Sequence, residues 1–144
     1  MFDITWQFSW LDVLIGAIVI FVVVIILFVV RRRPPEDIDV KQIQDKWVEI
    51  ESLISKDSEA MWRVAIIEAD NLLDFVLKGM IMPGETLGQR LKVACYKYEK
   101  LRNVWWAHKL RNTIVHESDY KLRRGEAAKA IKGFEHALKI LRVL

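Results

Sequence analysis

The longest uninterrupted apolar pattern of the chain lies near its start. Residues 13–30, VLIGAIVIFVVVIILFVV, contain no charged side chain. As an α-helix this run is roughly 27 Å long at about 1.5 Å per residue, close to the roughly 30 Å thickness of bilayer hydrocarbon. Asp12 stands at its outer edge, and Trp6 and Trp10 before it are typical of a membrane interface. The pattern predicts that residues 1–30 form an extracytoplasmic N-terminus and a transmembrane helix.

A cleaved signal peptide and a buried helix of a soluble domain are the alternatives to a membrane anchor. No basic region precedes the run, and Arg31-Arg32-Arg33 follows where a small-residue cleavage site would stand. The length of the run argues against a buried soluble helix. Because the nearby positive charge lies after the run, the positive-inside rule predicts a single-pass protein with its N-terminus outside and its C-terminal domain cytoplasmic. We expect a basic and proline-containing linker over residues 31–37 and a cytosolic bundle over residues 38–144.

Hydrophobic positions after the linker recur at helical spacing. A first stripe steps by four, three and four residues: Ile43, Trp47, Ile50 and Ile54. A second helix is expected from Asp57 or Ser58 to about Met80, before the helix-breaking pair Pro83-Gly84. The pattern predicts amphipathic helices that bury one face each.

Three further helices are expected in the second half of the domain. Thr86-Leu-Gly-Gln89 is typical of a capping box and begins a short helix. The next helix is expected from about Tyr98 to Glu117, followed by a turn over residues 118–120. The last stripe again steps by four and three: Ala127, Ile131, Phe134, Leu138 and Leu141. The prediction is an all-α fold, a bundle of four to five helices after the N-terminal apolar helix.

Charge is distributed unevenly along this domain. Residues 34–94 contain 7 basic and 12 acidic residues, whereas residues 95–144 contain 12 and 5. The asymmetry fits helix faces that attract each other within the bundle, and it also fits a basic surface for a polyanion. Aromatic and basic residues alternate in one short stretch: Lys92, Tyr96, Lys97, Tyr98 and Lys100. That mixture suits base stacking, although it is also common on an ordinary amphipathic helix.

The polar residues with the greatest chemical potential lie in residues 107–117, AHKLRNTIVHE. His108, Asn112 and His116 are four residues apart and form one row on a helix. The helix is apolar on most of its circumference, so these side chains are expected to be partly buried and to need partners.

An acidic partner is expected on the preceding long helix. Glu68 falls within the apolar stripe of that helix, where an unpaired carboxylate is costly. Arg111 or His108 is therefore its predicted partner. Asp70, Asp74 and Arg63 fall on another side of the helix and are expected to be solvated.

Metal and cofactor chemistry has little support in the sequence. The chain has three histidines and one cysteine, with no His-x3-His or Cys-x2-Cys pair. His108 and His116 are two helical turns apart, too far to share one metal ion easily. We expect no metal and no cofactor. Cys95 is the only cysteine, so no intrachain disulfide forms, which suits a reducing compartment.

The segment WWAHKLRNTIVHE resembles the R-x4-H signature of HEPN domains, named for higher eukaryotes and prokaryotes nucleotide-binding. The resemblance covers about residues 58–144 and includes the closing helix GEAAKAIKGFEHALKIL. It implies a helical bundle that is often a homodimer. Many such domains are metal-independent ribonucleases, and others bind nucleotides or RNA without cleavage.

The resemblance assigns roles by position. It implies that Arg111 holds the scissile phosphate, that Asn112 orients this arginine or bonds across a dimer, and that His116 transfers the proton. The nucleophile is then the 2′-hydroxyl of the RNA itself. His108 lies outside the signature and is expected to be structural, bonded to Glu68.

Two hypotheses from different functional classes follow. The first is a membrane-anchored domain that binds RNA or nucleotide, with metal-independent endoribonuclease activity as its catalytic form. The second is a non-catalytic, membrane-anchored module for dimerisation or for docking a protein partner. If the polar residues of 107–117 only stabilise the fold, the first hypothesis fails and the second remains.

Overall fold

The structure, a computed structural model, describes residues 10–30 and 39–144, with side chains described for residues 10–27 and 39–144. It divides into two compact units, residues 1–33 and 34–144. The predictions made for residues 1–9 and for the linker over residues 31–37 lie outside the described residues.

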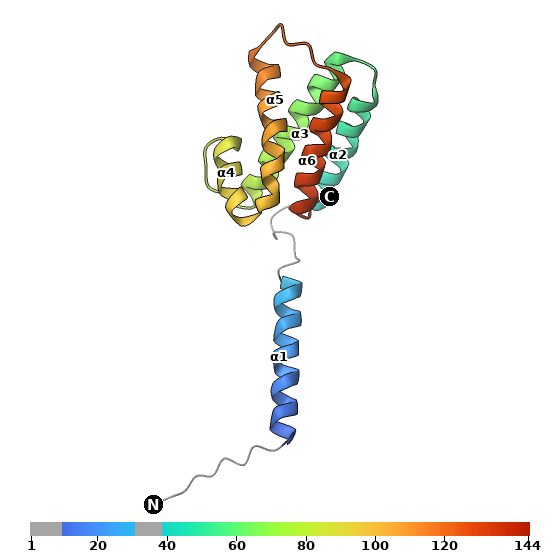
Figure 1. The fold of residues 1–144 in the computed structure, drawn as a ribbon. Coiled ribbons are helices and arrows are strands. Elements are labelled where there is room, and N and C mark those ends of the chain that lie inside the picture. Colours follow the sequence, from blue (N-terminus) through green and yellow to red (C-terminus); the bar gives the residue numbers. More distant parts are fainter. Residues whose placement is uncertain (1–9, 31–38) are drawn as a thin grey trace, which may run out of the picture. The chain divides into compact units, whose positions relative to one another are not determined.

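Helix α1, Trp10–Val30, forms the first unit (Figure 1). Its apolar window Trp10–Leu27 is long and apolar enough to cross a membrane, and none of it is buried. A core helix of a soluble domain would bury most of such a window. One exposed, apolar N-terminal helix is consistent with a membrane anchor or with a signal sequence.

The second unit is a packed helical bundle, which confirms the all-α prediction. Its helices are α2 Val40–Ser55, α3 Glu59–Gly79, α4 Leu87–Lys97, the 3₁₀ helix η1 Glu99–Val104, α5 Trp105–His116 and α6 Arg124–Ile140 (Figure 1). The helix expected from about Tyr98 is in fact two elements. Its first turns are the 3₁₀ helix η1, and the α-helix begins only at Trp105.

Polar caps fix two of the helix starts. The Thr86 side chain accepts a hydrogen bond from the Gln89 amide at 3.3 Å, and Gln89 Oε1 accepts one from the Thr86 amide at 3.3 Å. This confirms the capping box predicted for α4. Asp39 Oδ1 accepts hydrogen bonds from the amides of Lys41 and Gln42 at the start of α2. Each cap satisfies amide groups that have no partner within the helix.

Helix α3 is the centre of the bundle because it packs against α2, α4, α5 and α6. Its buried side chains therefore extend around more than one face: Ala65, Ile66, Ala69, Asp70, Leu72, Leu73, Val76 and Leu77. The apolar stripe in which Glu68 was placed includes Val64 and Phe75, and this part of the prediction is wrong because both are exposed. A single stripe describes a helix with one buried face, and α3 has several packing partners.

Helix α5 is apolar on most of its circumference, yet two of its apolar side chains are exposed. Trp106 and Val115 are exposed, as is Lys109. The Lys129 ammonium group of α6 lies 4.3 Å from the centre of the Trp106 ring, so this indole has a cation–π partner. Helix α5 also packs against α3, and the polar residues at this contact are considered below.

Candidate functional site

A buried carboxylate–imidazole pair joins α3 to α5. Asp70 Oδ1 lies 2.8 Å from His108 Nδ1. Asp70 is 3% exposed and His108 is 9% exposed. A carboxylate this deep requires charge or hydrogen-bond partners, so the pair fixes the rotation of both helices.

Arg111 and Asn112 extend this pair into a four-residue network. The Arg111 Nε atom lies 3.2 Å from Asp70 Oδ2, an ion pair whose angle is too bent for a hydrogen bond. Arg111 Nη1 donates to Asn112 Oδ1 at 3.2 Å. Asn112 Nδ2 lies 3.4 Å from His108 Nε2. The network leaves Arg111 Nη2 without a partner among the described residues.

The hydrogen bonds define one self-consistent tautomer of His108. Its Nδ1–H donates to Asp70, so its Nε2 accepts from the Asn112 amide group. The same amide presents its oxygen to Arg111. Asn112 therefore links the imidazole to the guanidinium.

The network forms one wall of an open groove of about 550 Å³ between α3, α4 and α5. His116, the last residue of α5, is exposed and lines the same groove as Arg111 and Asn112. The three residues assigned roles by the R-x4-H resemblance thus face one solvent-accessible space within a single protomer. Arg111 and His116 are not sealed inside the core.

A second ion pair fixes the α4 side of the groove. Arg90 is 4% exposed, and its Nε donates to Asp74 Oδ1 at 2.8 Å. Arg90 also donates to the carbonyl oxygens of Gly84 and Glu85 in the loop before α4. Lys78 adds a contact of 2.8 Å to Asp74. Arg90 is therefore fully engaged in attaching α4 and its loop to α3.

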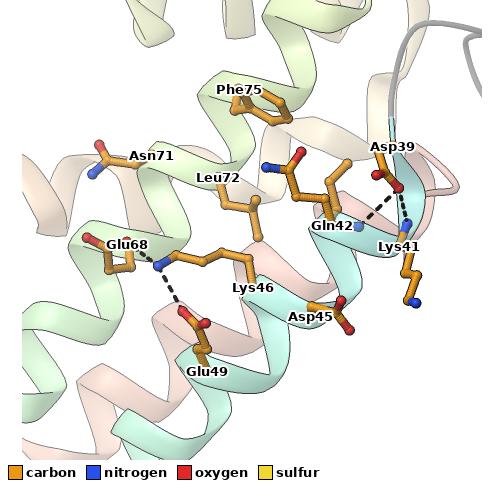
Figure 2. Close-up of a pocket in the computed structure, with 11 residues that line it drawn as sticks. Asp39, Lys41, Gln42, Asp45, Lys46, Glu49, Glu68, Asn71, Leu72 and Phe75 are labelled. Carbon is orange, nitrogen blue, oxygen red and sulfur yellow. Dashed lines mark hydrogen bonds and ion pairs between the residues drawn. The ribbon is translucent and has the colours of Figure 1, made fainter.

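The prediction that Glu68 pairs with Arg111 or His108 is wrong. Glu68 is one-third exposed and pairs with Lys46 of α2 at 3.2 Å, and Lys46 also lies 2.9 Å from Glu49. Figure 2 shows the Lys46 ammonium group between these two carboxylates. The hydrogen bonds that Lys46 donates to Glu49 and then to Glu68 raise the pKa of Lys46. Asp70, expected to be solvated, takes the buried position instead.

The reason for the error is the geometry of an α-helix. Two residues correspond to a rotation of about 200°, so Glu68 and Asp70 face nearly opposite directions. The sequence does contain the signal for Asp70, because Ile66, Asp70, Leu73 and Leu77 step by four, three and four. All four are buried. Asp74 and Arg63, also expected to be solvated, are partly buried.

Arg90 is a buried residue that the sequence-based reasoning missed. It lies in the apolar pattern of α4, three residues after Leu87 and four before Ala94, both of which are buried. A charged residue at such a position indicates a buried ion pair. In the described part of the chain, no three His, Cys, Asp or Glu side chains are grouped so that they could hold a metal ion.

The groove combines groups suited to binding and protonating an anion. Arg111 carries a permanent charge and a planar set of donors that matches phosphate oxygens. His116 is exposed, and an imidazole side chain can act as a proton donor or acceptor. Asp70 and Asn112 hold the guanidinium in place, which reduces the conformational cost of binding.

Comparisons with protein-family models, curated proteins and solved structures find no match. The chain is an all-helical protein with one N-terminal apolar helix, and no family is identified for it.

Proposed function

We propose that the helical domain binds RNA in the groove between α3, α4 and α5 and acts there as a metal-independent, HEPN-like endoribonuclease. The observation that carries the proposal is that Arg111, Asn112 and His116 line one open groove. A purely structural network would have no need of an exposed histidine at its edge.

Each residue has a role that its environment supports. Arg111 binds the scissile phosphate through the guanidinium edge that Asp70 and Asn112 leave available. His116 moves the proton of the reaction. The 2′-hydroxyl attacks phosphorus, the bond from phosphorus to the 5′-oxygen breaks, and the leaving oxygen takes up a proton. The products are a 2′,3′-cyclic phosphate and a 5′-hydroxyl end.

A membrane anchor and a homodimer are part of the proposal. Helix α1 is long and apolar enough to span the bilayer, which supports a single-pass protein with the bundle in the cytosol. The resemblance places Arg and His residues of two subunits together, so a second copy would supply a second His116 for the opposite proton transfer. Light scattering of the purified chain in detergent tests the dimer.

The decisive experiment incubates the full-length chain, in detergent micelles, with single-stranded RNA and excess chelator. We expect cleavage that continues in the chelator and leaves cyclic phosphate ends, identified by mass spectrometry. His116→Ala should abolish cleavage without changing the melting curve, because His116 is exposed and has no hydrogen-bond partner among the described residues.

His136→Ala is the matched control, because His136 is also exposed but lies on α6 and does not line the groove. Its cleavage rate should equal that of the parent. Loss of activity in both histidine variants, or cleavage by His116→Ala at the parent rate, would contradict the proposed role of His116.

A second candidate, a non-catalytic interaction module, is favoured by a different surface. A hollow of about 640 Å³ between α2 and α3 contains the apolar side chains of Leu72 and Phe75, and Phe75 is 49% exposed (Figure 2). Exposed aromatic side chains are common anchors of protein interfaces. A folded chain that neither binds nor cleaves RNA would leave this candidate standing.

A further inference from the structure

A second hollow lies beside the groove, between α4 and the start of α5. It has a volume of about 290 Å³ and is lined by Lys92, Cys95, Tyr96, Arg102 and Trp105. Tyr96 is 84% exposed, so most of its ring is open to solvent. Two aromatic rings and two cations therefore surround one small open space.

Both cations are available to a ligand. Lys92 has no ion pair or hydrogen bond to any side chain within residues 39–144. Arg102 has a single long contact, 3.7 Å to the exposed carboxylate of Glu99. Such an exposed ion pair contributes little to stability, so a phosphate can readily replace Glu99 as the partner of Arg102. No carboxylate lines the hollow.

The hollow and the groove share a wall. The Trp105 ring, which lines the hollow, meets the His108 ring, which lines the groove, edge to face at 5.9 Å between centroids. Gly88 of α4 lies over both rings: a Cβ atom there would be 3.5 Å from His108 Nε2 and 4.0 Å from Trp105 Cη2. The Trp105 and His108 rings therefore lie between the groove and the hollow.

We propose that this hollow is a nucleotide subsite for single-stranded RNA, in which one unpaired base stacks on Tyr96 and its phosphate contacts Lys92 and Arg102. The inference rests on the proposed function, since it names the class of nucleic acid that the groove receives. Stacking requires an unpaired base, so the subsite selects single strands over duplexes. It accepts different bases, because every base presents a π-face.

The test measures binding of the full-length chain in detergent to a short fluorescein-labelled, 2′-O-methyl single-stranded RNA by fluorescence anisotropy. The 2′-O-methyl group removes the nucleophile, so binding is observed without cleavage. Tyr96→Ala should weaken binding roughly ten- to hundredfold, the loss typical of one stacked base. Tyr96→Phe should restore it, because the ring alone carries the interaction.

The phosphate contact has a separate signature. Lys92→Ala should reduce the slope of log affinity against log salt by about 0.7, the value for one phosphate contact to a single strand. Tyr96→Ala should leave that slope unchanged. Lys41→Ala is the control, since Lys41 is exposed on α2 and lines a different hollow. A duplex of the same sequence should compete poorly for the parent chain.

The outcomes separate this subsite from the proposed reaction. With cleavable RNA, the subsite variants should raise KM and leave kcat at saturating RNA unchanged. Parent affinity and parent salt dependence in Tyr96→Ala and Lys92→Ala would overturn the subsite while leaving cleavage intact. RNA binding that depends on Tyr96 without any cleavage would overturn the nuclease and keep the subsite. No RNA binding by the parent would overturn both.

Discussion

Asp70 of α3 and His108 of α5 form a buried pair, with 2.8 Å between Oδ1 and Nδ1, and Arg111 approaches the other carboxylate oxygen at 3.2 Å. One carboxylate thus holds both the imidazole and the guanidinium of the groove wall. This relationship makes the stability of the bundle and the geometry of the candidate site depend on the same residue.

Asp70→Ala should destabilise the bundle by about 3–5 kcal/mol, because it leaves buried cationic and polar groups without their partner. Glu68→Ala should change stability by less than about 1 kcal/mol, because the Glu68–Lys46 pair is partly exposed. Urea unfolding of the full-length chain, followed by circular dichroism, measures both. Equal costs for the two variants would contradict the assignment of Asp70 as the supporting acid.

Much of the fold was predictable because several helices have a strong local signal, although the start of α5 after η1 has none. Ser58 precedes α3, and the Thr86–Gln89 capping box begins α4 where the sequence predicts it. Stripes at four and three spacing identify α2 and α6 in the same way. These signals depend on neighbours along the chain, so they need no knowledge of tertiary packing.

The site was predictable only in part, because tertiary packing decides which side chains contact the polar residues of α5. The polar row of α5 could be recognised, and Arg111, Asn112 and His116 do line one groove. The choice of Glu68 failed because α3 is buried on several sides, so that more than one apolar stripe exists along it. Choosing between two stripes requires knowing which neighbour covers each face.

The Glu59–Arg63 pair attaches the loop between α5 and α6 to α3. Glu59 Oε1 lies 2.8 Å from Arg63 Nη2 and accepts a hydrogen bond from the Leu122 amide at 3.1 Å. Arg63 also donates a hydrogen bond to the Tyr120 carbonyl oxygen. The hydrogen bond from Arg63, followed by that from the Leu122 amide, lowers the pKa of Glu59. The folded state therefore favours the ionised carboxylate.

Replacing Glu59 by glutamine should reduce the loss of unfolding free energy that the parent shows as the pH falls. A carboxyl group with a lowered folded pKa contributes stability above its unfolded pKa, about 4.3 for Glu, and loses it as the pH falls through the folded value. The stability gap between the parent and Glu59→Gln should thus be constant near neutral pH and shrink in acid. Urea unfolding across this pH range measures the gap, and a gap that grows in acid would contradict the assignment.

Glycine substitutions at two positions should have opposite effects. Gly84 has φ of +142°, and a Cβ there would lie 2.8 Å from the Arg90 amide nitrogen, so Gly84→Ala should cost about 1–3 kcal/mol or more. Gly125 lies in the first turn of α6 with open space around it, so Gly125→Ala should be neutral or stabilise by up to about 1 kcal/mol. Melting curves of the two variants provide the comparison.

Helix α1 should remain on the mature protein and hold it in the membrane. A chain tagged at both ends should retain both tags and stay in the membrane fraction after an alkaline carbonate wash. A C-terminal reporter should be active in the cytosol, and neutral replacements of Arg31, Arg32 and Arg33 should weaken this orientation. Loss of the N-terminal tag would identify residues 10–30 as a cleaved signal sequence.

Arg111 should have separable roles in stability and in catalysis. Its Nε atom lies against Asp70, so Arg111→Ala should cost about 1–3 kcal/mol, the range for a hydrogen bond or ion contact to a charged group. Arg111→Lys should recover part of that stability, because it keeps the positive charge beside the carboxylate. It should still lose RNA cleavage by about a hundredfold or more, because lysine lacks the planar fork that binds two phosphate oxygens while contacting Asp70.

The comparison of the two Arg111 variants distinguishes a catalytic role from a structural one. Unfolding curves and cleavage rates are measured on the same preparations, and rates are compared only for chains that are fully folded at the assay temperature. If Arg111 acts only through the fold, activity follows stability, and Arg111→Lys regains both together. If Arg111 binds the scissile phosphate, Arg111→Lys is a folded chain with little activity. Cleavage by a folded Arg111→Lys chain at the parent rate would remove Arg111 from the reaction.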